Sequence, residues 1–201
     1  MLSARSLCAR QLQHGRPLLT PSVSSARSLC AWQSQHGRAL LAPFVPSPAL
    51  VVNAALDMLQ LMTADVFLDL GCGDGRVVEA ALRRGVGRAV GVELSLELAL
   101  AARKRVRAAL RSRSAASAEI LQADFCAAEC ASVLHSASAL YIFLSPAGAR
   151  FASDLSAPRA PALRKIVSCD FPLLDDPRWR LEESRRVMDL ELFMYARSNS
   201  H

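Results

Sequence analysis

The chain has 201 residues, of which 52% are hydrophobic, so it can bury the core of one α/β domain and is not disordered throughout. Its formal net charge is +6, but all 18 acidic residues lie after residue 56, where they nearly balance 19 basic residues. The positive excess therefore belongs to the first 56 residues, and the remainder lacks the charge expected of a nucleic-acid-binding domain.

Residues 1–41 form a separate segment that contains part of an internal repeat. Residues 3–21 and 25–43 match at fifteen of nineteen positions with a period of 22 residues. The segment carries five arginines, many serines and no acidic residue, which is typical of a mitochondrial transit peptide. We therefore predict a disordered, transit-peptide-like segment over residues 1–41, a mitochondrial location, and a folded domain over residues 42–201. A tail without a targeting signal, or a misassigned gene start, is the alternative.

The rest of the chain alternates helices and strands. A helix is predicted that ends at about residue 62, with Ser47 as its N-cap and Pro48 in its first turn. Strands are expected at 66–70, 89–94, 119–122, 139–144 and 165–171, helices at 76–84, 96–111, about 127–134 and 147–155, and a terminal hairpin at 179–185 and 187–196. This order predicts an α/β, Rossmann-like sheet of seven strands, mostly parallel with a terminal antiparallel hairpin, and helices on both faces.

Two kinds of site are not expected from the sequence. The six cysteines show no zinc-site spacing, so no metal is predicted. The best apolar stretch, residues 39–62, is interrupted by three prolines, so no transmembrane segment is predicted either.

A glycine-rich sequence follows the first predicted strand. Gly71, Gly73 and Gly75 are spaced GxGxG before a helix, which allows a sharp turn and close approach of a ligand to the backbone. Asp69 and Asp74 stand beside the turn. Carboxylates are unfavourable neighbours for a dinucleotide pyrophosphate but favourable ones for the ammonium and sulfonium groups of S-adenosylmethionine, so we predict that cofactor. A glycine-rich turn that binds nothing is the alternative.

Acidic residues also end the next two predicted strands. Glu93 ends the second, where an acid accepts hydrogen bonds from ribose hydroxyls; a surface acid is the alternative. Asp124 follows the third, where it could accept from the adenine amino group while Phe125 packs on the ring. The alternative for Asp124 is a cap of the following turn.

No catalytic base stands out in the sequence. Ser145 and Asp170 lie at the carboxyl ends of the fourth and fifth predicted strands and are candidates, although each also fits an ordinary turn or cap. Ser145-Pro-Ala-Gly148 lacks the second proline and the aromatic residue of adenine-N6 methyltransferases, which disfavours that reaction. Phe143, Phe171 and Tyr195 could line an apolar channel near the strand ends; core packing is the alternative for each.

Together these residues resemble the class I, seven-β-strand methyltransferases. A narrower similarity, to the small mitochondrial protein-lysine methyltransferases of adenine nucleotide translocase and ATP synthase c-subunit, rests on five segments in order. These are Pro43-Phe-Val-Pro46, Asp69-Leu-Gly-Cys-Gly-Asp-Gly-Arg76, Gly91-Val-Glu-Leu94, Phe143-Leu-Ser-Pro146 and Ile166-Val-Ser-Cys-Asp-Phe-Pro172. The resemblance implies a protein substrate, a lysine of an inner-membrane protein.

Other functions share the cofactor motifs. An RNA or small-molecule methyltransferase would have them, and so would a non-catalytic scaffold that binds S-adenosylmethionine. A basic patch with aromatic residues would favour RNA, and the nearly neutral domain argues against it. An NAD-dependent oxidoreductase is disfavoured by the GxGxG spacing and the absence of a second, catalytic domain.

Overall fold

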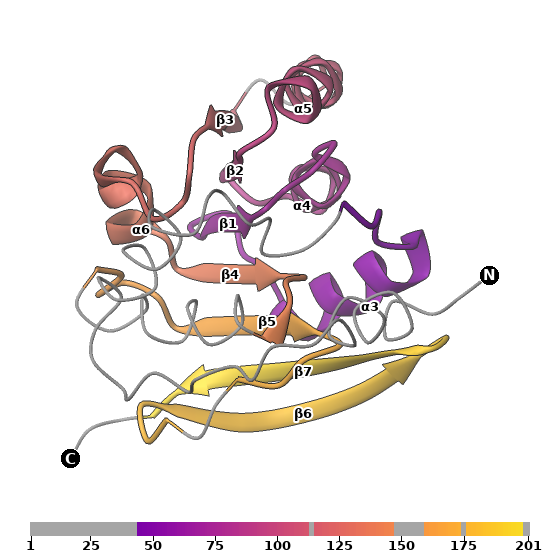
Figure 1. Ribbon diagram of the computed structural model, residues 1–201, viewed down its shortest axis with the longest axis vertical. Coiled ribbons are helices and arrows are strands. Elements are labelled where there is room, and N and C mark those ends of the chain that lie inside the picture. The colour runs from indigo at the N-terminus through magenta and orange to yellow at the C-terminus, as the bar shows by residue number, and fades with distance from the viewer. Residues whose placement is uncertain (1–43, 113–114, 147–158, 174–175, 199–201) are drawn as a thin grey trace, which may run out of the picture.

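The computed structural model describes residues 44–112, 115–146, 159–173 and 176–198. The segment of residues 1–41 and the helix predicted over residues 147–155 lie outside the described residues. The described elements, shown in Figure 1, are α3 (Ala49–Leu59), β1 (Val66–Leu70), α4 (Arg76–Arg83), β2 (Arg88–Glu93), α5 (Leu96–Leu110), β3 (Ser117–Gln122), the 3₁₀ turn η1 (Ala128–Cys130), α6 (Ala131–Ser136), β4 (Ala139–Ile142), β5 (Lys165–Cys169), β6 (Trp179–Val187) and β7 (Leu190–Arg197).

These strands form one seven-stranded sheet in the order β3-β2-β1-β4-β5-β7-β6 (Figure 1). The first five are parallel, and β7 lies antiparallel to both β5 and β6. This confirms the predicted parallel sheet with a terminal antiparallel hairpin. From β1 the chain moves outward through β2 to β3 and then returns to the other side of β1 with β4. Open α/β sheets bind ligands at the carboxyl ends of strands where the order reverses. The glycine-rich turn after β1 lies at this position.

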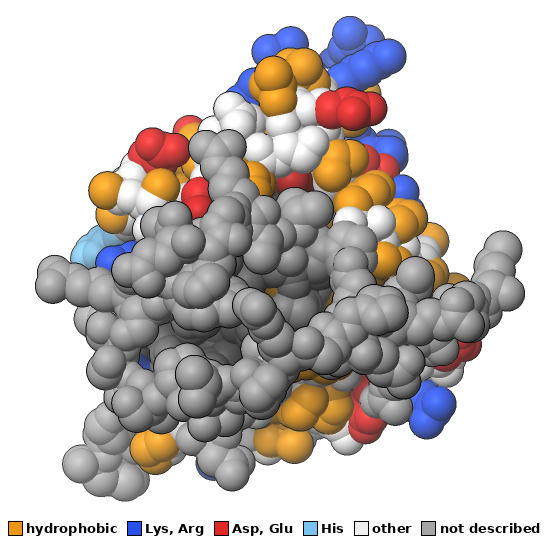
Figure 2. All heavy atoms as spheres, in the orientation of Figure 1, with side chains coloured by type: hydrophobic (Ala, Val, Ile, Leu, Met, Phe, Trp, Pro, Cys, Tyr) orange, Lys and Arg blue, Asp and Glu red, His pale blue; other side chains and the backbone are white. Residues whose placement is uncertain are grey.

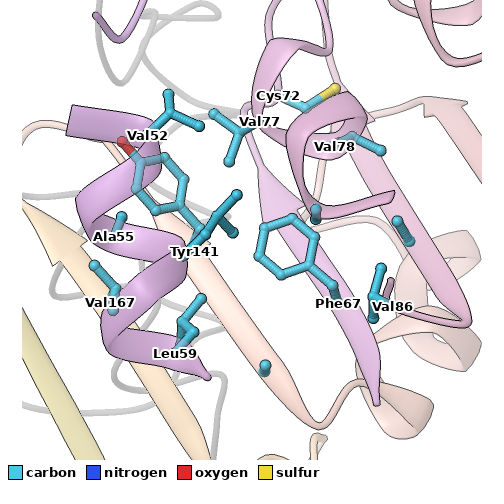
Figure 3. Packing of buried hydrophobic residues seen from close by; sticks show 14 of the residues in the cluster. Val52, Ala55, Leu59, Phe67, Cys72, Val77, Val78, Val86, Tyr141 and Val167 are labelled. Atoms are coloured by element: carbon cyan, nitrogen blue, oxygen red, sulfur yellow. The ribbon is translucent and has the colours of Figure 1, made fainter. Parts of the chain in front are cut away.

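Alternate residues of the central strands point to opposite faces and divide the core into two clusters. One cluster lies under α3, α4 and α5. Figure 3 shows Tyr141 of β4 beside Val52 and Ala55 of α3, and Phe67 of β1 near Val78 of α4. The second cluster joins the other face of the sheet to α6. Helices therefore cover both faces, as predicted.

The predicted N-cap of the first helix is wrong. Pro48 precedes the first turn of α3, and no side chain caps that turn. The Ser47 hydroxyl instead shares a hydrogen bond of 3.1 Å with the hydroxyl of Tyr141. Tyr141 is buried, and this burial raises the pKa of its phenol well above the usual value. A buried phenol needs a polar partner, and Ser47 provides it for Tyr141 instead of capping the helix. This hydrogen bond connects the start of α3 to β4.

A polar cluster fastens the amino ends of three adjacent strands. The buried Asp65, just before β1, accepts hydrogen bonds from the Met62 N–H (2.8 Å) and the Ser138 hydroxyl (2.7 Å), and it pairs with Arg164. Burial alone would raise the pKa of Asp65, but these three donors outweigh it and hold the pKa below 3.8. Ser138 precedes β4 and Arg164 precedes β5, so the cluster fixes the sheet edge opposite the glycine-rich turn.

We expect Asp65→Asn to lower the free energy of unfolding at pH 7 by about 1–3 kcal/mol, because buried donors lose a charged acceptor. The folded-state pKa of Asp65 lies below its unfolded value, so its contribution is complete above pH 4 and is lost as the pH falls through the folded pKa. Denaturant titrations at pH 7 and pH 3 should show the difference from wild type shrinking at the lower pH.

Asp57→Asn is the matched control, because Asp57 pairs with Arg84 on the exposed surface of α3. Its effect should stay below about 0.5 kcal/mol. Equal losses in the two variants at pH 7 would contradict the role given to Asp65.

Candidate functional site

The glycine-rich turn leaves β1 and enters α4 through three left-handed residues. Gly71, Gly73 and Gly75 have φ angles of +76°, +54° and +78°, a region that favours glycine. The N–H groups of Gly71 and Cys72 both donate to the carbonyl of Val92, at 2.8 and 3.0 Å. The turn is therefore fastened to the end of the neighbouring strand, β2.

At two of these positions a neighbouring side chain packs so close to the backbone that only glycine fits. A Cβ at Gly75 would lie 2.8 Å from the Cβ of Ala102, so this glycine lets α5 pack against the start of α4. A Cβ at Gly73 would lie 2.2 Å from the ring of Phe44, which comes from the segment before α3. An aromatic ring thus rests directly on the middle of the turn.

The side chain of Cys72 folds over β2 rather than toward solvent. A Cβ at Gly91 would lie 2.6 Å from the Cys72 sulfur and 2.8 Å from Ile120 Cδ1. Burial raises the pKa of the Cys72 thiol, so the thiol is protonated at neutral pH and acts as a small apolar side chain. The bare backbone of Gly91 leaves the space that this sulfur fills.

Glu93 connects the glycine-rich turn to the end of β2. Its carboxylate accepts one hydrogen bond from the Gly73 N–H at 2.8 Å and another from the Ser95 N–H at 2.8 Å, one at each oxygen. The side chain is nearly buried, which contradicts the alternative of a surface acid. Since each carboxylate oxygen can accept more than one hydrogen bond, Glu93 can hold the turn and still accept from a ligand hydroxyl.

Asp69 is the most unusual ionisable group of the site. It lies in β1, faces the same side of the sheet as Glu93, and is only 3% exposed. Burial, with the negative charges of Glu93 and Asp74, raises its pKa to about 8, and no described donor or positive charge offsets these effects. A cation placed here would be stabilised by a carboxylate that has no other partner among the described residues.

Asp74 has a different role from Asp69. Its carboxylate accepts from the Arg76 guanidinium at 2.8 and 2.9 Å and from Arg105 at 2.9 Å, and these bonds, with the two positive charges, hold its pKa below the usual value. Arg105 also donates to the Asp74 carbonyl at 3.0 Å. The structure therefore uses Asp74 to bind the turn to α5, whereas Asp69 and Glu93 pair with no Lys or Arg among the described residues.

The predicted adenine-binding residues follow β3. Asp124 is exposed, and its carboxylate accepts from the Cys126 N–H at 2.9 Å, so the predicted alternative of a turn cap is present. This bond fixes the loop and occupies one carboxylate oxygen. Phe125 is half-buried and packs against the core cluster under α6.

The two candidate catalytic residues lie in the loops that follow β4 and β5. β4 ends at Ile142 and β5 at Cys169, each two residues early, so Ser145 and Asp170 follow the carboxyl ends of these strands. Ser145 is half-buried. Asp170 is 2% exposed with φ +67°, a left-handed conformation that aspartate tolerates better than most residues. Their position agrees with a ligand site, and their chemistry stays a prediction.

The prediction that three aromatic residues line one apolar channel is wrong. Phe143 packs against the core cluster under α3 to α5, whereas Phe171 and Tyr195 belong with the cluster on the other face of the sheet. The Tyr195 hydroxyl also accepts a hydrogen bond from the Leu173 N–H at 3.1 Å. Phe143 and Phe171 follow the carboxyl ends of β4 and β5, whereas Tyr195 lies opposite Ile166 near the start of β5.

Sequence reasoning missed Phe44 and Arg105. Arg105 was visible only as one of several basic residues on a helix surface. Phe44 lies within Pro43-Phe-Val-Pro46, which was noted for its resemblance and given no role. Within the described residues, no helix has the length and apolarity to cross a membrane, and no cluster of three or more His, Cys, Asp or Glu side chains is arranged for a metal.

Comparison with known sequences identifies a family and one partial relative. The model of a family described as the ANTKMT methyltransferase domain matches residues 69–182, more than half of the chain. The protein-lysine N-methyltransferase of Saccharolobus islandicus (strain REY15A) is 42% identical over 53 residues, which are 26% of this chain and 33% of that protein. The match thus spans about a third of the relative's length.

Solved structures share the fold. An RNA methyltransferase from Salinibacter ruber, in complex with S-adenosyl-L-homocysteine, is 25% identical with a TM-score of 0.66, over 78% of this chain and 96% of that one. TrmK of M. capricolum, also with S-adenosyl-homocysteine, is 9% identical with a TM-score of 0.53, over 75% and 69% of the two chains, and shows the fold alone.

The raised pKa of Asp69 predicts that this residue costs stability when no ligand is bound. The folded protein binds a proton at Asp69 between pH 4 and pH 8 that the unfolded chain does not, so stability falls as the pH rises through this range. Asp69→Asn should therefore raise the free energy of unfolding by about 1–3 kcal/mol at pH 8 and change it little at pH 4.

Asp74→Asn tests the opposite sign within the same turn. Its loss of two guanidinium partners should lower the free energy of unfolding at pH 8. Denaturant titrations of the ligand-free proteins across pH 4–8 measure both effects, and destabilisation by Asp69→Asn at pH 8 would count against the assignment of Asp69.

Proposed function

The chain belongs to the ANTKMT methyltransferase domain family, and we propose that it transfers the methyl group of S-adenosylmethionine to the side-chain amine of a protein lysine. The observation that carries the lysine proposal is the 42% identity to a protein-lysine N-methyltransferase over 53 residues. That match covers a third of the relative, so lysine as the acceptor is a proposal. The methyltransferase activity rests on the family match.

The predicted cofactor, S-adenosylmethionine, agrees with the family and with the S-adenosylhomocysteine in similar structures. The residues of this site fit it. The buried carboxyl of Asp69 has no counter-charge among the described residues, and the cationic methionine end would favour its ionised form. Glu93 retains acceptor capacity for ribose hydroxyls. Asp124 and Phe125 stand at the end of β3 for the adenine. We propose these roles with Gly71, Gly73 and Gly75 as the backbone surface.

The residues of the chain have a limited chemical task in this reaction. S-adenosylmethionine supplies an electrophilic methyl group on a positively charged sulfur. The protein has to orient the acceptor, which can lower the barrier by several kcal/mol, on the order of the effect of proximity in other enzymes. A lysine must also lose its proton, and apolar surroundings lower the pKa of an amine. Ser145 and Asp170 lie at the correct sheet edge to contact an acceptor there.

RNA methylation is the second candidate, because the Salinibacter ruber relative of this fold is an RNA methyltransferase. Figure 2 shows Lys and Arg side chains gathered at the end of the molecule that α5 forms, and Lys104, Arg107 and Arg111 are exposed there. However, α5 begins at the site edge of the sheet and runs away from it, so its last turn lies near the opposite edge. These charges are poorly placed to hold RNA at the glycine-rich turn, which favours a protein acceptor.

We also propose a mitochondrial protein as the acceptor, most simply one of the inner membrane. Support comes from the arginine-rich, acid-free first 41 residues and from the sequence resemblance.

The acceptor can be found by labelling. Purified protein and S-adenosylmethionine with a labelled methyl group are added to mitochondrial membranes and to total RNA from cells that lack this gene. We expect one protein band to take label, on lysine after hydrolysis, and Asp69→Ala to reduce the label at least tenfold. Label in RNA or a metabolite, with none on lysine, would overturn the lysine proposal and leave the methyltransferase assignment intact.

Location is tested independently of the acceptor. Residues 1–41 fused to a fluorescent reporter should direct it to mitochondria because of their five arginines. A variant with these arginines changed to glutamine is the control and should leave the reporter in the cytosol. A cytosolic or secreted reporter from the unchanged segment would refute the proposed location.

A further inference from the structure

The segment before α3 is fastened over the glycine-rich turn at two points. The Ser47 hydroxyl bonds the Tyr141 hydroxyl in β4, and the Arg76 guanidinium donates to the Ser47 carbonyl at 3.3 Å. Arg76 is itself held by Asp74 within the turn. The segment is thus held from two sides, by the sheet through Tyr141 and by the turn through Arg76.

The ring of Phe44 is the part of the segment that reaches the turn. Ring atoms Cε2 and Cδ2 lie 2.2 and 2.7 Å from the place of a Cβ at Gly73, so the ring packs on the bare α-carbon. Phe44 is nevertheless 48% exposed, which is unusual for a phenylalanine that makes such a close contact. Core packing alone does not explain a ring that leaves half of its surface open beside a ligand site.

Gly73 lies between the two ends of the proposed cofactor site. Its N–H is held by Glu93, the proposed ribose acceptor, and Asp69, the proposed partner of the methionine end, lies in β1 just before the turn. The sulfonium of S-adenosylmethionine is covalently located between ribose and the amino-acid group. A ring that rests on Gly73 is therefore next to the part of the ligand that carries the sulfonium charge.

We propose that Phe44 is a cofactor-selectivity residue, whose ring stabilises the sulfonium of S-adenosylmethionine through its π face. This inference rests on the cofactor placement proposed above. The aromatic face carries negative electrostatic potential and attracts a nearby cation. S-adenosylhomocysteine has the same adenosine and amino-acid groups but a neutral sulfur, so the contact distinguishes the substrate from the product and favours product release.

The ratio of the two affinities separates this role from simple packing. The full chain is titrated with S-adenosylmethionine and with S-adenosylhomocysteine by calorimetry. In Phe44→Leu, which keeps an apolar side chain without a π face, we expect S-adenosylmethionine to bind roughly three- to tenfold more weakly and S-adenosylhomocysteine to change less than about twofold. Phe44→Trp should keep or raise the preference for the charged cofactor, because indole binds cations best.

Leu181→Ala is the matched control, since Leu181 in β6 is 50% exposed and lies far from the turn in the sheet order. It should leave both affinities unchanged, and thermal denaturation checks that each variant folds. Equal weakening of both ligands in Phe44→Leu would overturn the inference, because packing alone has that effect. Tighter binding of both would also overturn it, because the ring would then obstruct the site. Failure of the wild type to bind either ligand would instead refute the proposed function.

Discussion

A buried carboxyl group at the end of β1, which has no counter-charge among the described residues, is the constraint around which this site is built. Asp69 is buried beside two other acids, and its pKa is raised to about 8. Ionisation of this group costs free energy in its buried surroundings, so the carboxyl is mostly protonated at neutral pH, and a bound cation would favour its ionised form. The other two acids beside Asp69 are already engaged within the protein, because Asp74 pairs with two arginines and Glu93 accepts from two backbone N–H groups.

The turn itself is held before any ligand arrives. Val92, Glu93 and Arg105 each bond it from outside, so its backbone conformation does not depend on the cofactor. Three left-handed glycines would otherwise be among the most flexible residues of the chain, since glycine loses the most conformational freedom on folding. Binding to such a turn costs little further ordering, which leaves more of the contact energy for affinity.

The sequence was a good guide where one residue or one period determines the outcome. Apolar periodicity predicted all seven strands, and the spacing of Gly71, Gly73 and Gly75 located the turn, because left-handed geometry selects glycine locally. Sequence-based prediction failed where the role of a side chain depends on residues that are distant in the chain. Ser47 was expected to cap a helix but pairs with Tyr141, 94 residues away. Phe143 and Tyr195 were grouped by strand ends, yet they pack against core clusters on opposite faces of the sheet. The separate roles of Asp69 and Asp74 required knowing where Arg105 lies.

The contact of Cys72 with the bare α-carbon of Gly91 has an evolutionary consequence. A Cβ at position 91 would meet both the Cys72 sulfur and Ile120, so the volumes of these three residues are limited together. A larger residue at 91 is accessible to a lineage only after position 72 or 120 has become smaller, and the reverse order passes through an overpacked intermediate. Substitutions at these positions are therefore epistatic, and the three sites should covary among homologues even though they come from three different segments of the chain.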